Sequence, residues 1–309
     1  MSSPFPTRRE LLRLAGAVAA ALALPPPRLL RAYAARSPDR ERLDAWTAAL
    51  RADELIRREE PIGRAAARVG ELAEGTPYEA GTLDTYLSRG GSRPPNPEPL
   101  ALSLTRFDCV TLVESCLAVP RAAARDTEPS WDRFGHEIER MRYRGGVRHG
   151  YASRLHYFSE WITDGERRGL VRDLGAELGG AEDARPLRFM TAHRARYPAL
   201  RDRDVFREVG TMERRLDGHP RRVVPTKRIP EVVGRIETGD VLAFATEIPG
   251  LDVTHAAFAY RDSAGVLRVL HAPLSGGVVE VTRTTLPEYV AAIPRATGIL
   301  AARPLWGTA

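Results

Sequence analysis

One cysteine stands where the chain could carry out nucleophilic chemistry. Cys109 follows Asp108 in the run Phe-Asp-Cys-Val-Thr, and apolar residues at 109, 112, 113, 116 and 117 share one helical face. Asp108 is a good N-cap. In the first turn of a helix, backbone N–H groups and the helix macrodipole stabilise a thiolate. The pattern therefore predicts that Cys109 is a nucleophile, and the alternative of a small buried core residue stays open.

The second cysteine, Cys116, lies two helical turns further on and is predicted to belong to the core. At a rise of about 1.5 Å per residue the two Cα atoms would lie about 10 Å apart. A disulfide needs them within about 7 Å. If the segment is helical, the two cysteines of the chain therefore cannot pair.

A thiol nucleophile needs a base that takes its proton and later returns it to the leaving group, and histidine suits this role. His255 begins a predicted strand after Asp-Val-Thr, and His271 ends the next predicted strand. Their separation of 16 residues allows a hairpin that brings both side chains to the same edge of a sheet. His271 would then orient and polarise His255, as the third member of a triad does.

The sequence predicts mainly helices before Pro225 and mainly strands after it. Helical periodicity over residues 39–72 is broken at Pro61 and predicts two helices. The run from Ser130 to Gly146 predicts another, with Ser130 as its N-cap. A further helical stretch is expected near 153–163, and residues 164–222 are expected to form helices and loops. After Pro225, short apolar runs at 241–245, 256–260, 266–271 and 278–281 predict antiparallel strands. Helices first and strands last indicate the α+β class.

The net charge of +6 is concentrated at the start of the chain. Residues 1–34 hold five arginines against one glutamate, which leaves a charge of only +2 for the rest. Binding of nucleic acid would need clustered positive charge in the folded part. The composition therefore argues against a nucleic-acid partner.

The N-terminus is typical of an export signal. Thr7 to Arg13 resembles a twin-arginine motif, an uncharged apolar run from Leu14 to Leu24 follows, and Ala32-Tyr33-Ala34 predicts cleavage after Ala34. An ordinary helix or an uncleaved anchor is the alternative. The signal predicts transient contact with the twin-arginine export machinery and a periplasmic or extracellular destination.

Five short motifs, in order along the chain, carry a family resemblance. These are Gly75-Thr76-Pro77-Tyr78, Asp108-Cys109, Gly239-Asp240-Val241, Thr254-His255 and Leu270-His271-Ala272. Together they resemble the NlpC/P60 superfamily of cell-wall peptidases, over roughly residues 61–304. The run Phe-Asp-Cys-Val-Thr and the segment from Arg154 to Trp161 resemble its DUF1460 branch. The resemblance implies a papain-like fold, with an antiparallel sheet packed on the helix that bears the cysteine and with extra helical segments.

The resemblance also implies roles for single residues. Cys109 matches the nucleophile, His255 the base, His271 the third polar residue, and Tyr78 a tyrosine whose hydroxyl lies beside the thiol. Members of the branch are N-acetylmuramoyl-L-alanine amidases that act on peptidoglycan fragments, including anhydro-muropeptides, with no metal or organic cofactor. The chain departs from many relatives at Ala257, where they have Gly, and at Pro273, where they have Ser.

Four further residues are candidates for the substrate cleft. Arg154 could pair with a peptide carboxylate, while His156, Tyr157 and Trp161 could contact sugar or peptide. Packing within a helix is the equally weighted alternative.

The predicted organisation is a signal peptide over 1–34, an N-terminal helical arm over 35–60, and a catalytic domain over 61–309 with a helical insertion around 120–225.

Three other functions stay open at this point. The same triad could cleave γ-D-glutamyl-diamino acid bonds, as an endopeptidase of the same fold. Cys109, His255 and His271 could instead be zinc ligands. A peptidoglycan-binding protein without activity is the third alternative.

Overall fold

The computed structural model describes residues 37–57, 59–88, 94–95, 97–124, 130–273 and 277–307. Its strands are β1 (Val171–Asp173), β2 (Ala181–Asp183), β3 (Arg221–Pro225), β4 (Val241–Thr246), β5 (Val253–Arg261), β6 (Leu267–His271), β7 (Glu280–Val281) and β8 (Ala296–Pro304). They form one sheet in the order β2-β3-β8-β4-β5-β6-β7, with β1 also paired to β8. Every pairing between described strands is antiparallel.

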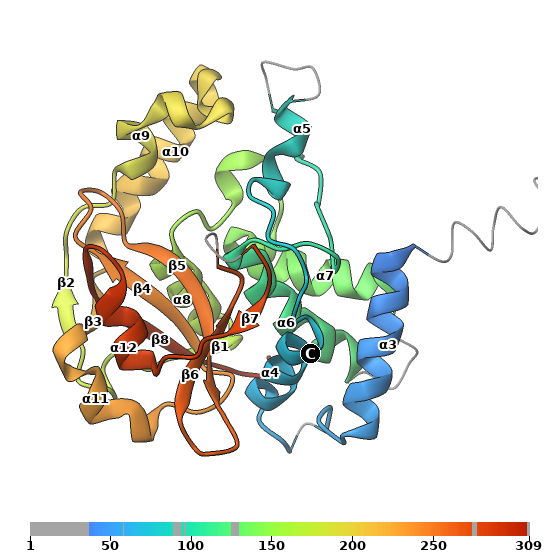
Figure 1. Ribbon diagram of the computed structural model, residues 1–309. Helices are drawn as coiled ribbons and strands as arrows, with labels where there is room; N and C mark the ends of the chain where they lie inside the picture. The colour runs from blue at the N-terminus through green and yellow to red at the C-terminus, as the bar shows by residue number, and fades with distance from the viewer. Residues whose placement is uncertain are drawn as a thin grey trace, which may run out of the picture.

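Helices cover both faces of this sheet (Figure 1). They are α3 (Pro38–Ala52), α4 (Ile62–Leu72), α5 (Thr85–Ser88), α6 (Cys109–Ala123), α7 (Trp131–Arg142), α8 (Phe158–Arg167), α9 (Phe189–Ala192), α10 (Arg203–Arg215), α11 (Ile229–Val232) and α12 (Leu286–Ala292). The helices α3, α4, α6 and α7 share the main core with one face. The helices α11 and α12 cover the other face.

The central strands are buried on both sides, which explains their nearly continuous apolar sequence. On β5, Ala256 and Phe258 belong to the core that contains α6, while Ala257 and Ala259 belong to the core that contains α12. Residues that alternate along a strand point to opposite faces of the sheet. The helix that begins with Cys109 therefore packs on one face of β5.

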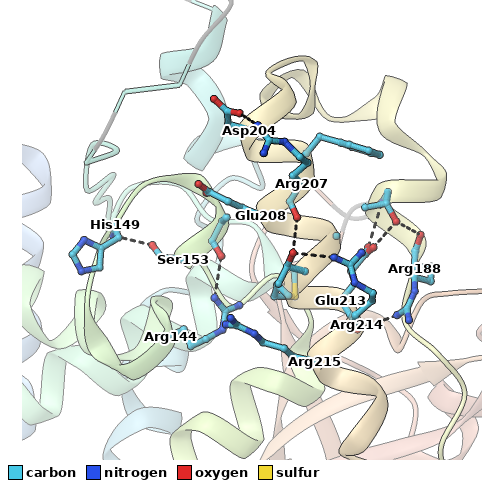
Figure 2. A pocket seen from close by; sticks show the side chains of 16 residues that line it. Arg144, His149, Ser153, Arg188, Asp204, Arg207, Glu208, Glu213, Arg214 and Arg215 are labelled. Carbon is cyan, nitrogen blue, oxygen red and sulfur yellow. Dashed lines mark hydrogen bonds and ion pairs between the residues drawn. The ribbon is translucent and has the colours of Figure 1, made fainter.

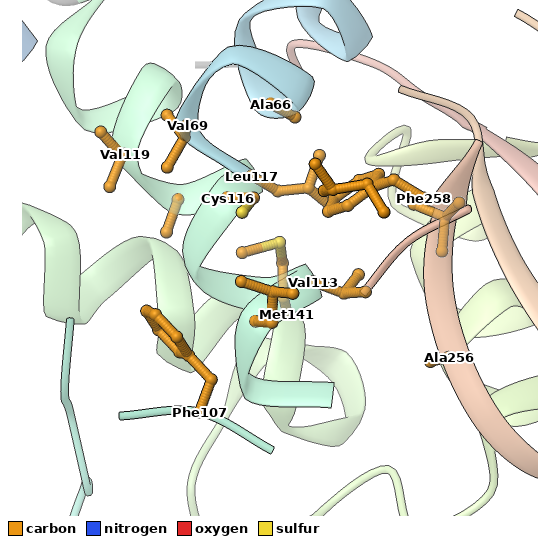
Figure 3. Packing of buried hydrophobic residues seen from close by; sticks show 14 of the residues in the cluster. Ala66, Val69, Phe107, Val113, Cys116, Leu117, Val119, Met141, Ala256 and Phe258 are labelled. Atoms are coloured by element: carbon orange, nitrogen blue, oxygen red, sulfur yellow. The ribbon is translucent and has the colours of Figure 1, made fainter. Parts of the chain in front are cut away.

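The core around α6 is densely packed (Figure 3). Cys116 lies among α4, α6 and β5, with 1% of its surface exposed. Both cysteines are free thiols, as the helical spacing predicts. Cys116 is therefore a core residue, as expected.

The Gly239-Asp240 motif fixes β4 against α4. Gly239 has φ +88, and a Cβ there would lie 1.9 Å from the carbonyl oxygen of Gly63. Only glycine accepts this backbone conformation together with so close an approach. Asp240 is buried and accepts hydrogen bonds from the guanidinium of Arg303 on β8 at 2.8 and 2.9 Å.

Several elements form where the sequence predicts them. The helices α3 and α4 lie on either side of Pro61, and α6 and α7 begin after their predicted caps, Asp108 and Ser130. The four predicted strand runs correspond to β4, β5, β6 and β7. The α+β class is confirmed.

Other elements differ from the prediction. Residues 164–222 contain β1, β2 and the start of β3 in addition to helices, because strands of three to five residues are too short to leave a periodic signal. The central strand β8 and the helix α12 also lie outside the predicted set.

The N-terminal arm packs onto the rest of the protein. Leu43, Trp46 and Leu50 of α3 are buried in the main core beside α4 and α6. The predicted signal peptide lies outside the described residues. Among the helices that are described, none has the length and apolar character needed to cross a bilayer.

Candidate active site

A reciprocal cap fixes the start of α6. The backbone N–H of Thr111 donates to the carboxylate of Asp108 at 2.8 Å, and the backbone N–H of Asp108 donates to the hydroxyl of Thr111 at 2.9 Å. Each side chain satisfies a backbone group that a helix end leaves unpaired. The preceding Phe107 is fully buried. Cys109 is thereby held as the first residue of α6.

The sulfur of Cys109 lies against β5. The backbone N–H groups of Ala256, Val110 and Cys109 itself lie near enough to the sulfur to act against the rise of its pKa. Strand β6 pairs with β5 only from Phe258 onward. The edge of β5 before that residue is therefore where the start of α6 can dock.

The two predicted histidines meet. His255 on β5 and His271 at the end of β6 share a hydrogen bond of 2.8 Å between Nε2 and Nδ1, respectively. Their rings are nearly perpendicular, with an interplanar angle of 77°. The ring of His255 also stacks on Phe244, its partner across the β4–β5 pair. The hairpin predicted from the 16-residue spacing is present.

His255 directly precedes Ala256, whose N–H reaches the thiol. The part of β5 beside the sulfur is thus the backbone of Ala256, the sequence neighbour of His255. Among the described residues, no hydrogen bond joins the thiol to either imidazole. Such catalytic hydrogen bonds often tighten only in the complex with substrate.

Burial sets the protonation of all three groups. Burial raises the pKa of the Cys109 thiol from 9.0 to about 12, the carboxylate of Asp108 adds to the rise, and the backbone N–H groups act in the opposite direction. Burial lowers the pKa of His255 to about 4. It lowers that of His271 to about 3, with a further contribution from His255. At neutral pH the resting site therefore holds a neutral thiol and neutral imidazoles.

This state corrects one expectation from the sequence. The helix N-terminus alone predicts a thiolate, and its N–H groups do favour one. However, moving the thiolate charge out of water costs more free energy than its attraction to the partial charges of one helix N-terminus provides. The desolvation of Cys109 depends on β5, which comes from a distant part of the sequence.

Tyr78 lies beside the start of α6. Residues 77–79 pair with Phe107, through the bonds Phe107 N to Pro77 O (3.1 Å) and Glu79 N to Phe107 O (2.9 Å). The pKa of the Tyr78 hydroxyl is raised, first by burial and then by the negative charges of Cys109 and Asp108. Tyr78 is thus close enough to the thiol to respond to its charge.

Two residues that sequence reasoning missed contact His271. The hydroxyl of Tyr289 on α12 lies 3.2 Å from His271 Nδ1, and the carboxylate of Glu280 on β7 lies 3.8 Å from His271 Nε2. The capping signature of Thr285 and Glu288 could have predicted α12. No sequence pattern would have paired that helix with His271.

The four predicted cleft residues are bonded or packed inside the protein. All three arms of the Arg154 guanidinium are occupied, by Glu98 at 2.6 Å, Asp84 at 2.7 Å and the carbonyl of Leu83 at 2.9 Å. The Arg154 guanidinium is therefore a buried cross-link, with each of its three nitrogens already bonded inside the protein.

The aromatic members are also engaged inside the protein. The ring of His156 bonds to the carbonyl of Tyr151 at 2.9 Å, and the hydroxyl of Tyr157 donates to Glu213 at 2.7 Å. Trp161 is 3% exposed and stacks on Phe158. These contacts favour the packing alternative for the segment.

The zinc alternative gains no support. Within the described part of the chain, no three His, Cys, Asp or Glu side chains are grouped so that they could hold a metal ion. Cys109, His255 and His271 therefore do not form such a group.

A groove of about 1090 Å³ lies elsewhere, between α10 and residues 144–153 (Figure 2). Its charged lining residues include Arg144, Arg188, Arg207, Arg214, Arg215, Asp204, Glu208 and Glu213. Several of these already pair, such as Arg144 with Glu160 and Arg207 with Asp204. None of Cys109, His255, His271 and Tyr78 lines it. We place the candidate site at Cys109, because Ala256, which lies beside its thiol, is the sequence neighbour of His255, and His255 is bonded to His271.

The fold is of the α+β class and is similar to that of solved amidase structures. The chain belongs to the AmiA-like family, described as N-acetylmuramoyl-L-alanine amidase-like, whose family model matches residues 68–299. This membership indicates a hydrolase that acts on material derived from peptidoglycan. A search of the curated proteins returns no significant match.

Solved structures agree on the fold. An N-acetylmuramoyl-L-alanine amidase from Bacteroides uniformis is 28% identical, with a TM-score of 0.71, covering 79% of this chain and 98% of its own. A Bacteroides fragilis protein provisionally named a xylanase is 32% identical, with a TM-score of 0.69 and coverage of 76% and 99%. A Legionella pneumophila protein assigned to the DUF1460 family model is 17% identical, with a TM-score of 0.60 and coverage of 85% and 93%, and supports the fold alone.

Proposed function

We propose that the protein is a cysteine-dependent N-acetylmuramoyl-L-alanine amidase with a papain-like fold of the NlpC/P60 type. It hydrolyses the amide between the lactyl group of muramic acid and L-alanine in muropeptides, including anhydro forms. The observation that carries this proposal is Cys109 at the capped start of α6, beside Ala256 of β5, whose sequence neighbour His255 is bonded to His271. Membership of the amidase-like family supports the choice of bond.

The reaction proceeds by acyl transfer through a thioester. His255 accepts the thiol proton while Cys109 Sγ attacks the lactyl carbonyl carbon. The backbone N–H of Cys109 and the hydroxyl of Tyr78 donate to the developing oxyanion. His255 then returns the proton to the nitrogen of L-alanine as the C–N bond breaks, and water hydrolyses the thioester.

Burial leaves His255 unprotonated at neutral pH, so one of its ring nitrogens can accept the thiol proton. A pKa of about 4 also makes this imidazole a weaker base than an ordinary histidine, whose pKa is about 6.5. Since the thiol is protonated at rest, attack and proton transfer to His255 must be coupled.

The name of the Bacteroides fragilis protein raises the question of glycoside hydrolysis. Most glycosidases place two carboxyl groups about 5 to 9.5 Å apart across the scissile bond. Here the carboxylate of Asp108 is engaged in the helix cap, and that of Glu280 faces His271. The residues at Cys109 therefore support acyl transfer.

Defined muropeptides test the proposal. Wild-type protein is expected to release L-alanyl peptides from anhydro-muropeptides, as read by mass spectrometry. Cys109→Ala is expected to release none, because the bond-forming atom is gone, while Cys116→Ala serves as the matched control for loss of a thiol from α6.

Three results would contradict it. Turnover retained by Cys109→Ala would remove the nucleophile from the mechanism. Cleavage at γ-D-glutamyl bonds would keep the triad but assign the endopeptidase reaction, and no turnover of any muropeptide would support a binding protein.

We also propose export through the twin-arginine pathway, to the periplasm or the cell exterior. The support is the motif at Arg8 and Arg9 with the apolar run that follows it. Cell-wall material, the substrate class of the family, lies outside the cytoplasmic membrane.

A further inference from the structure

The two ring nitrogens of His271 have different surroundings. Nδ1 lies near two polar groups, and Nε2 has no hydrogen-bond partner among the described residues. Nδ1 lies 2.8 Å from His255 Nε2 and 3.2 Å from the hydroxyl of Tyr289. Nε2 is buried and makes no hydrogen bond. The carboxylate of Glu280 lies 3.8 Å from that nitrogen.

A neutral imidazole carries its proton on one nitrogen only, so these contacts define two alternatives. If His271 were protonated at Nδ1, it would donate to His255 Nε2. The proton of neutral His255 would then be on its Nδ1, and His255 would have no nitrogen free to accept the thiol proton. If His271 is protonated at Nε2, its Nδ1 accepts the N–H of His255, and Nδ1 of His255 is free to act as the base.

We propose that Glu280 and Tyr289 are positioning residues that hold His271 in the form protonated at Nε2. A carboxylate can only accept hydrogen bonds, so Glu280 favours N–H at the nitrogen it faces. The hydroxyl of Tyr289, at the longer distance of 3.2 Å, can act as the weaker of two donors that share the one lone pair of Nδ1, and so favours an unprotonated Nδ1. Both effects keep His255 ready for the proton of Cys109. The inference rests on the proposed function, since it concerns the base of that reaction.

The fold holds both residues in place. Glu280 is the direct partner of His271 in the β6–β7 pairing, so the two side chains share one face of the sheet. The exposed fraction of the Glu280 side chain is 49%, so a small rotation can shorten 3.8 Å to a hydrogen bond.

Tyr289 stands on a helix with a complete capping box. Thr285 and Glu288 exchange hydrogen bonds at the start of α12. The ring of Tyr289 meets that of His271 edge-on, at 82°. Its pKa is raised to about 12, first by burial and then by Glu280 and Cys109, so its hydroxyl stays a donor across the working pH range. The titratable neighbours of His271 are thus His255 on β5, Glu280 on β7 and Tyr289 on α12.

The test combines a spectroscopic reading with kinetics on the full chain. Nitrogen-15 NMR of histidine-labelled protein reports which ring nitrogen of His271 carries the proton, without any substrate. The variants are Glu280→Gln, Tyr289→Phe and the matched control Glu182→Gln, which lies on β2 at the opposite edge of the sheet and is similarly exposed. Turnover of anhydro-muropeptide is measured from pH 4 to 9.

We expect wild-type His271 to be protonated at Nε2, and Glu280→Gln to shift it toward protonation at Nδ1. The value of kcat should fall about ten- to a hundredfold with KM within about twofold, because orientation of a base is lost and substrate contacts are not. Tyr289→Phe should act in the same direction by a smaller factor, and Glu182→Gln should match wild type.

Protonation of wild-type His271 at Nδ1 would overturn the proposal. So would a Glu280→Gln variant that equals Glu182→Gln in both the NMR spectrum and kcat. If wild type turns over no muropeptide while the NMR result holds, the proposed reaction has failed and the arrangement of His271 has not.

Discussion

The protonation state of Cys109 gives the sharpest test of the site. The pKa of this thiol is raised from 9.0 to about 12, chiefly by burial and then by Asp108. Each pKa unit is a tenfold change in population, so the thiolate at pH 7 is about a thousandfold rarer than for a free thiol. Only the thiolate reacts with alkylating agents. Cys109 should therefore react slowly with iodoacetamide although it is partly exposed.

The assay uses a Cys116→Ala background, so that Cys109 is the remaining thiol. Intact-protein mass spectrometry follows alkylation by iodoacetamide between pH 6 and 10. The expected rate rises about tenfold per pH unit without a plateau, because the thiolate population grows in this way below its pKa.

Asp108→Asn supplies the matched perturbation. Asparagine caps a helix as well as aspartate does, so the start of α6 should persist while the negative charge beside the sulfur is removed. The pKa of Cys109 should fall and its alkylation should become faster at every pH below 10. Rapid alkylation of the unchanged protein at pH 6 to 7 with a plateau would show a preformed thiolate–imidazolium pair and refute the neutral resting state.

Two further predictions concern stability and export. Arg142→Met should lower the free energy of unfolding by about 3 to 5 kcal/mol in urea titrations, because it leaves Glu114 buried without its partner at 2.7 Å. The double variant with Glu114→Leu should recover part of this loss, and a loss below about 1 kcal/mol for Arg142→Met would contradict the reasoning. Replacing Arg8 and Arg9 by Lys should leave an uncleaved precursor in the cytoplasmic fraction, and normal processing in cell fractionation would exclude the twin-arginine route.

Local sequence patterns are sufficient to predict the helices around the site. The periodicity of α3, α4 and α6 and the caps Asp108 and Ser130 lie within a few residues of the structure they specify. The hairpin of β5 and β6 is also local, so the spacing of His255 and His271 predicts their meeting.

Strand β8 could not be predicted from local sequence patterns. It lies between β3 and β4 in the sheet, and its residues are buried from both sides, so it shows no alternation of polar and apolar side chains. Gly298 allows a close approach, since a Cβ there would lie 2.0 Å from the carbonyl oxygen of Val224. That requirement exists only once β3 is in place.

The candidate nucleophile and its two histidines could be recognised from the amino acids alone, because helix capping and hairpin spacing act over short stretches of chain. The charge state of Cys109 could not, since it follows from burial against β5, 140 residues or more away. The same holds for the internal bonding of Arg154 and for the contacts of Glu280 and Tyr289 with His271. Desolvation and pairing between distant segments arise only when the whole chain has packed.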